Sequence, residues 1–167
     1  MALIMFNTNV DALLNECEAE ILGIETIATH LGITSNVVPY LSKYALIKSC
    51  GTIEQSFKTI VADHCSFRSK PQVKNYLTKL VRNSSSNPSF DNMCSLLKSF
   101  DSQWHQNFKY EVNSDPASAS LKTSLQSLVD ARNEFAHGGS PRISISDVIA
   151  YYRSARQVIE KLDMVVR

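Results

Sequence analysis

The spacing of apolar residues along the chain constrains its fold more than any other feature. In the first segment, apolar side chains recur every three or four positions, at Val10, Leu14, Cys17, Ile21, Ile24, Ala28 and Leu31. This period matches the turn of an α-helix and places these side chains on one face. No segment shows the alternation of apolar and polar residues that is typical of a half-buried strand. The sequence therefore predicts an all-α fold.

Residues that end helices divide this pattern into a bundle of five or six helices. The first helix ends near Gly32, because glycine favours helix C-termini, and Ser35 or Asn36 can cap the second helix. The second helix is expected to reach about residue 65, and the later segments are 71–80, 90–110, 116–137 and 146–166. The last two are expected to form an antiparallel hairpin across the short 138–141 loop.

Length and charge limit the classes of protein to which the chain can belong. Its 167 residues are enough for one hydrophobic core, so we expect a single domain over residues 1–167. The net charge is +1, with 17 basic and 16 acidic residues, so no basic field covers the whole molecule. If the chain binds RNA, a local cluster of cations must hold the phosphates.

The cysteines and the apolar runs indicate the compartment. The four cysteines lie inside apolar helical patterns without the paired spacing of a zinc site; they are Cys17, Cys50, Cys65 and Cys94. Buried free thiols favour a reducing environment. No apolar stretch has the length of a membrane span, and the first residues lack the basic flank of a signal peptide. We therefore expect a cytoplasmic protein with no membrane association, no metal and no cofactor.

Arg132 interrupts the apolar stripe of the predicted penultimate helix. The apolar members of that stripe are Leu121, Leu125, Leu128 and Phe135. A cation on a buried stripe is costly unless it is paired or faces a cleft. Asn133 and His137 stand one turn apart, so their side chains emerge on the same side of the helix. Arginine, amide and imidazole together make a candidate phosphate-binding site at the C-terminal end of this helix.

A structural role for these residues is the alternative. Arg132 would then pair with an acid such as Glu54 or Asp130, and His137 would only cap the helix end. Polar residues near helix ends are common, so the residues taken alone favour this structural role over a catalytic one.

The segment Arg132-Asn133-Glu134-Phe135-Ala136-His137-Gly138 resembles the HEPN motif, in which arginine and a polar residue precede a histidine near the end of the penultimate helix. The flanking residues 128–131, the following Gly138-Gly139 and the tyrosines of the last helix are also similar to that family. Residues 45–58 resemble the earlier HEPN helix, which tends to carry a glutamate, here Glu54. The resemblance covers roughly residues 40–70 and 115–166, and among the subfamilies RiboL-PSP-HEPN is the most similar.

This resemblance implies a metal-independent endoribonuclease in which the ribose 2′-OH attacks the adjacent phosphodiester. His137 would act as general base or acid, and Arg132 would stabilise the charge that develops on the phosphorane oxygens. Asn133 would orient the phosphate or the histidine. Glu54 would hold Arg132 or tune His137.

The resemblance also implies partners. HEPN domains typically form homodimers in which two motifs line one cleft, and here Arg142 and Lys58 would add positive charge to it. RNA would be the substrate, and a toxin or antiviral effector would also have an antitoxin or another partner protein. Gly139 occupies the position at which the HepT toxin branch has a tyrosine, which argues against that branch.

Two rival functions stay open. One is a non-catalytic HEPN module that uses the same cleft to bind RNA or protein and to dimerise. The other is a helical interaction domain in which Arg132 and His137 stand at this spacing by chance. The intact set of Arg132, Asn133 and His137 favours catalysis over a non-catalytic module, because degenerate modules commonly lose one of the three.

Three further groups have a functional interpretation that is weaker than the structural one. His64 and Cys65 with Cys50 suggest a metal site, but the ligand spacing of one is missing. His105 beside Trp104 could stack on a base, although packing is favoured. A basic run surrounds Tyr76 and is favoured as a solvated face over an RNA track; it consists of Lys70, Lys74, Lys79 and Arg82.

Overall fold

The computed structural model describes residues 5–32 and 34–167, and it confirms the all-α fold. The α-helices in this part of the chain are α1 (Thr8–Leu31), α2 (Val38–Ser66), α3 (Pro71–Leu77), α4 (Phe90–Phe100), α5 (Ser102–Asn113), α6 (Ser118–Ala136) and α7 (Ile145–Val165). A π-helical turn, η1 (Thr78–Arg82), continues α3. None of these helices is long and apolar enough to cross a membrane.

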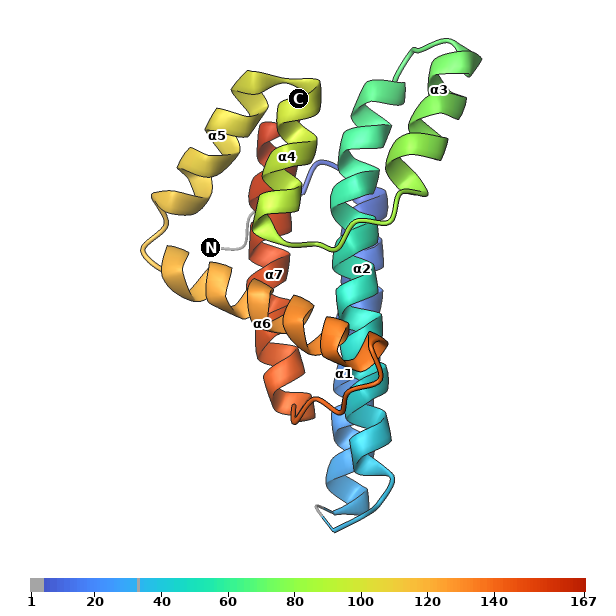
Figure 1. The fold of residues 1–167 in the computed structure, drawn as a ribbon, viewed down its shortest axis with the longest axis vertical. Coiled ribbons are helices and arrows are strands. Elements are labelled where there is room, and N and C mark those ends of the chain that lie inside the picture. Colours follow the sequence, from blue (N-terminus) through green and yellow to red (C-terminus); the bar gives the residue numbers. More distant parts are fainter. Residues whose placement is uncertain (1–4, 33) are drawn as a thin grey trace.

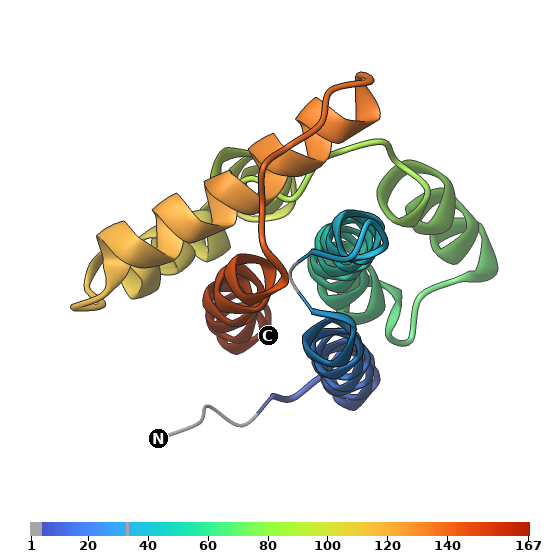
Figure 2. The same cartoon turned by 90° about the horizontal axis from the view of Figure 1, so that it is seen from below.

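Helices α1, α2 and α7 pack along the long axis of the molecule, and α6 lies across α2 and α7 (Figures 1 and 2). The predicted apolar stripe of α1 is buried from Val10 to Ile24, whereas Leu31 is exposed. Figure 1 shows the reason, because the end of α1 and the start of α2 extend beyond the other helices. The predicted inner face of α2 is buried throughout, at Leu46, Cys50, Ile53, Phe57 and Ile60.

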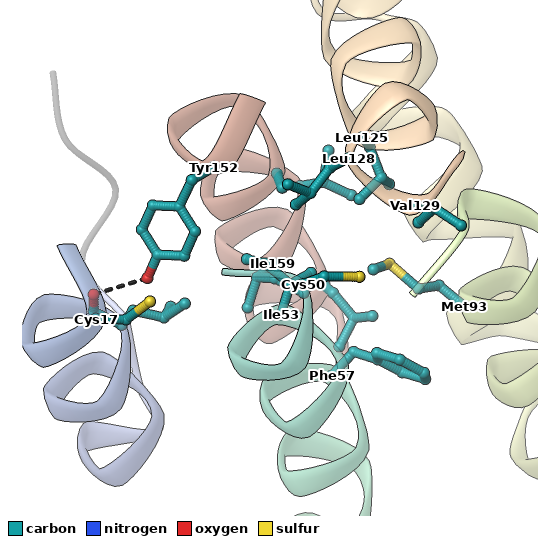
Figure 3. Close-up of a cluster of buried hydrophobic side chains, with 14 of the residues drawn as sticks. Cys17, Cys50, Ile53, Phe57, Met93, Leu125, Leu128, Val129, Tyr152 and Ile159 are labelled. Carbon is teal, nitrogen blue, oxygen red and sulfur yellow. Dashed lines mark hydrogen bonds between the residues drawn. The ribbon is translucent and has the colours of Figure 1, made fainter. Parts of the chain in front are cut away.

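The core lies where α2 meets α4, α6 and α7 (Figure 3). Cys50, Ile53 and Phe57 of α2 face Met93 of α4 and the apolar stripe of α6. On the other side of α7, the hydroxyl of buried Tyr152 donates a hydrogen bond of 2.7 Å to the Leu14 carbonyl of α1. This packing holds α6 across α2, and it thereby fixes the position of the end of α6.

The predicted helix over residues 90–110 is wrong in one respect, since it is two helices. Asp101 has an extended backbone with φ −153° and ψ 121°, which ends α4. Its carboxylate accepts hydrogen bonds from the backbone N–H groups of Gln103 and Trp104, and so caps α5. The apolar period continues across this break, and the described residues therefore form seven α-helices where the sequence predicts five or six.

Two smaller expectations are also corrected. Helices α6 and α7 do not form an antiparallel hairpin, because α6 crosses α7 steeply in both views (Figures 1 and 2). The N-cap of α2 is Val37, which offers no capping side chain, and neither Ser35 nor Asn36 occupies that position. Helix α7 begins with a capping box formed by Ser144 and Asp147, close to the predicted start.

Candidate active site

The end of α6 is built by its two glycines. Gly138 has φ +84°, a left-handed conformation that favours glycine. Its N–H donates to the Phe135 carbonyl, and the N–H of Gly139 donates to the Glu134 carbonyl, which is the Schellman pattern of helix termination. A Cβ on Gly139 would lie 2.6 Å from Cγ of Glu134. The helix end therefore requires glycine at both positions, and together they make His137 the C-cap residue.

The structure brings Arg132 and Asn133 into direct contact. Nη1 of Arg132 donates a hydrogen bond of 3.1 Å to Oδ1 of Asn133, and both side chains are half-buried. His137 is joined to Asn133 through the backbone, because its N–H donates to the Asn133 carbonyl at 3.0 Å. The imidazole of His137 is exposed. The three predicted residues thus share the last turns of α6, with the guanidinium on the inner side and the imidazole in solvent.

Arg132 faces the middle of α2. Burial raises the pKa of the Cys50 thiol to about 12, and the charge of Arg132 acts against this rise. Glu54 lies one turn further along α2, and its negative charge, like burial, raises the pKa of the Cys50 thiol. Arg132 and Glu54 are therefore both close enough to Cys50 for their charges to affect it, and they belong to one neighbourhood between α2 and α6.

Glu54 does not hold Arg132, which corrects that part of the expectation. Its carboxylate forms an ion pair with Lys58, one turn along the same helix. Lys58 is buried with 4% exposure and also donates to the Ser84 carbonyl, so it is not a free cation for a cleft either. Glu54 precedes Lys58 by one turn, which is the favourable orientation for an ion pair between positions i and i+4 of a helix.

Within the described residues, Arg132 forms no ion pair with Asp130 either, so neither pairing expected for a structural role is present. Oδ1 of Asp130 accepts a hydrogen bond of 2.7 Å from Gln126 on the exposed side of α6. Across residues 5–32 and 34–167, no carboxylate lies within 4.0 Å of the Arg132 guanidinium. A guanidinium has five N–H donors, and the protein engages one of them here. The remaining donors are available for an anion.

A polar hollow lies between α2 and η1, and Glu54 is part of its wall. Its volume is about 470 Å³, and it is lined by Gly51, Glu54, Gln55, Lys58, Thr59, Arg82, Asn83 and Ser84. The π-helical turn directs Arg82 toward α2, where it pairs with Asp63 and donates to Thr59. The sequence motif does not place Arg82 in this region, although the sequence contains one signal. No acidic residue occurs between Asp63 and Asp91, a stretch with five basic residues at 68, 70, 74, 79 and 82.

A second hollow, which we call the aromatic hollow, lies between the first turns of α2 and the end of α6. Its volume is about 350 Å³, and it is lined by Tyr40, Lys43, Tyr44, Ile47 and Phe135. The core pattern of the sequence does not reveal it, because Tyr40, Tyr44 and Ile47 lie on the face of α2 turned away from the core. Their spacing of four and three residues was the available signal.

The three further groups of residues considered in the sequence have packed or solvent-exposed positions. The ring of His64 meets Trp104 edge-on, with ring centroids 5.1 Å apart, and Trp104 packs against the core. In the described residues, no three His, Cys, Asp or Glu side chains gather as metal ligands would. Lys70, Lys74 and Lys79 are exposed to solvent, whereas Arg82 turns inward.

The comparison with protein families extends the resemblance. The RiboL-PSP-HEPN family model matches residues 12–166, from the first turns of α1 to the end of α7. The chain therefore belongs to the RiboL-PSP-HEPN family. The match includes α3, α4 and α5, which carry no motif that resembles the family. No curated protein and no solved structure matches the chain.

Proposed function

We propose that the chain is a metal-independent endoribonuclease whose active site is formed by Arg132, Asn133 and His137. One observation carries the proposal: a half-buried guanidinium that contacts an amide and has no carboxylate partner within the described residues. A cation in this position is costly unless a ligand pairs with it. A phosphodiester fits, because its oxygens match the planar fork of arginine.

The reaction follows from the chemistry of RNA. The 2′-oxygen attacks the adjacent phosphorus as its proton passes to a base, and the bond from phosphorus to the 5′-oxygen breaks. The leaving oxygen takes a proton, so the products end in a 2′,3′-cyclic phosphate and a 5′-OH. His137 takes or gives the proton, Arg132 binds the phosphorane oxygens, and Asn133 holds the guanidinium in place.

A homodimer completes this proposal. A single His137 serves as either base or acid, whereas two copies of the motif in one cleft supply both. Two copies of Arg132 also concentrate positive charge in a chain whose net charge is only +1. Family membership is consistent with such a module, and a role as a toxin or antiviral effector, held in check by an antitoxin or another partner protein, would suit this activity.

One observation favours the rival function, a non-catalytic HEPN module that binds RNA or protein. Catalytic histidines are usually oriented by a hydrogen bond to the second ring nitrogen. In the part of the chain that the structure describes, His137 forms a backbone hydrogen bond but none through its imidazole. Either a second copy or the substrate orients this ring, or the site binds without cleaving.

Cleavage of a labelled RNA in excess EDTA tests the proposal. We expect cleavage to persist, to stop at a scissile nucleotide that lacks the 2′-OH, and to give cyclic-phosphate ends. His137→Ala should abolish it, whereas His30→Ala should not, although His30 also lies in the last turn of a helix. If activity disappears with EDTA and returns with magnesium, the proposed mechanism is wrong. If RNA binds and no condition gives cleavage, the non-catalytic module is the better description.

A further inference from the structure

The aromatic hollow is an unassigned concave surface beside the proposed active site. Its walls are large apolar side chains that the fold leaves exposed: Tyr40 is 72%, Tyr44 52% and Ile47 41% exposed. Side chains of this kind on the surface mark interaction sites when they gather in one place. We propose that the aromatic hollow binds a nucleobase of the RNA, next to the phosphate that Arg132 holds; this inference rests on the proposed function.

The first argument for a base subsite is the position of the hollow next to the motif. Phe135 belongs to the same turn of α6 as Arg132, so the hollow begins where the motif is. On α2, the hollow extends from Tyr40 to Ile47, and Phe135 brings the last turns of α6 against this segment. One helical turn rises about 5.4 Å. A nucleotide whose phosphate contacts Arg132 therefore has the hollow within reach of its base or of the adjacent base.

The second argument for a base subsite is the chemistry of the side chains that line the hollow. The ammonium of Lys43 lies 5.5 Å from the ring centre of Phe135 and 5.9 Å from that of Tyr40. It also donates to Oγ of Ser140 at 2.9 Å, and within residues 5–32 and 34–167 it forms no ion pair. Flat apolar walls beside an unneutralised cation are complementary to a flat ring that carries a phosphate.

The hollow is also held in shape before a ligand arrives. The hydroxyl of Tyr44 donates to the Glu20 carboxylate of α1, and Lys48 pairs with the same carboxylate at 2.6 Å. These contacts fix one wall, and Lys43 ties another to the 138–141 loop through Ser140. A volume of about 350 Å³ is in the range of small-molecule sites and admits a single base. A preformed site loses less conformational entropy on binding.

Binding of matched RNAs tests the base subsite. The probes are a short labelled single-stranded RNA and the same RNA with its bases removed, both titrated at one salt concentration into His137→Ala protein, which prevents cleavage. We expect Tyr40→Ala to weaken binding of the intact RNA by about 5- to 140-fold, the usual effect of losing one stacking partner. Binding of the abasic RNA should change by less than about twofold, as for an ordinary surface substitution.

Two variants keep the result specific. Tyr110 of α5 is 70% exposed, close to the 72% of Tyr40, so Tyr110→Ala is a matched control and should affect neither probe. Tyr40→Phe keeps the ring and should bind the intact RNA as the unsubstituted protein does. If Tyr40→Ala behaves like Tyr110→Ala, or weakens both probes equally, there is no base subsite.

A second copy of the chain is the other possible occupant, and light scattering on the same variants separates the two. If Tyr40→Ala converts a dimer into monomers, the aromatic hollow is an interface between copies and the inference is overturned. The test also distinguishes a failure of the base subsite from a failure of the proposed function. Cleavage that needs Arg132 and His137 but ignores Tyr40 refutes the base subsite alone, whereas base-dependent binding without any cleavage refutes the ribonuclease alone.

Discussion

Two arginines of this chain lie half-buried on the helices that close the core, and their surroundings are opposite. Arg156 on α7 donates from Nε to Glu160, from Nη1 to Glu18 and from Nη2 to Asp11, at 3.1–3.2 Å. Arg132 on α6 donates to the neutral amide of Asn133 alone among the described residues. The same side chain is thus surrounded by three carboxylates in one place and left with free donors in the other.

This difference separates a structural cation from a candidate binding cation. Each nitrogen of Arg156 has a carboxylate partner, so it can hold α1 against α7 but has little capacity for a ligand. Asn133 neutralises none of the charge of Arg132 and uses one donor only. The protein therefore retains a desolvation cost at Arg132 that an anion would relieve, which a structural role does not explain.

Replacing Arg132 should give the largest effect, and the effect should be on activity. We expect Arg132→Ala to lower the rate of RNA cleavage by about 100- to 1000-fold, the usual result of removing a donor to a developing anion. The melting temperature should change by less than about 2 °C, because no ion pair is lost. Single-turnover cleavage and thermal unfolding measure the two effects. A large drop in melting temperature with cleavage retained would make Arg132 structural.

Replacing Arg156 should give the reverse result. Arg156→Ala leaves the partly buried Glu160 without its ion-pair partner, whereas Glu18 keeps its ion pair with Arg153, and such a loss typically costs about 1–3 kcal/mol. For a chain of this length, the melting temperature should fall by about 2–12 °C. Per folded molecule, RNA cleavage at a low temperature should stay as in the unsubstituted protein. If Arg156→Ala abolished cleavage of the folded protein, the contrast between the two arginines would be lost.

Glu54 allows a further comparison with Arg132 near the candidate active site. Its carboxylate pairs with Lys58 and not with Arg132, so Glu54→Gln should reduce cleavage by less than about tenfold. The neutral amide keeps the shape of the side chain and tests the charge. A loss as large as that of Arg132→Ala would show that Glu54 acts in the reaction directly. Gln55→Glu, on the next position of α2, serves as a control for charge near the polar hollow.

The fold could be predicted from the sequence because its helices are amphipathic and each buried stripe is local information. The Asp101 break was missed, since the apolar period runs through it and the evidence is a cap formed by one carboxylate. The motif residues could be located on α6 by resemblance. The partners of Arg156 and the aromatic hollow could not, because Asp11 and Phe135 come from distant parts of the chain and meet their neighbours only through packing.

The smallest predicted effect is a dependence of stability on pH. We expect it for the ion pair of Lys161, which is a structural cation, and not for Arg132. Lys161 of α7 is 8% exposed and pairs with Asp115 at 2.8 Å. The hydrogen bond from Lys161, and then that from the Ala117 N–H, lower the pKa of Asp115 below its ordinary value of 3.8. The native state therefore binds fewer protons there than the unfolded chain, and the stability from this pair is present above that value and is lost as the pH falls through the lowered pKa.

Asp115→Asn should consequently lower the melting temperature slightly near neutral pH. The difference from the unsubstituted protein should stay constant from about pH 7 to about pH 4 and should shrink below that, because acid then removes the same charge from Asp115 itself. Any small difference caused by Arg132→Ala should show no such narrowing, since no carboxylate pairs with Arg132 in the described residues. Thermal unfolding over this pH series measures both. If the Arg132→Ala difference also vanished in acid, a carboxylate would have to pair with Arg132 in solution, and its availability for phosphate would be refuted.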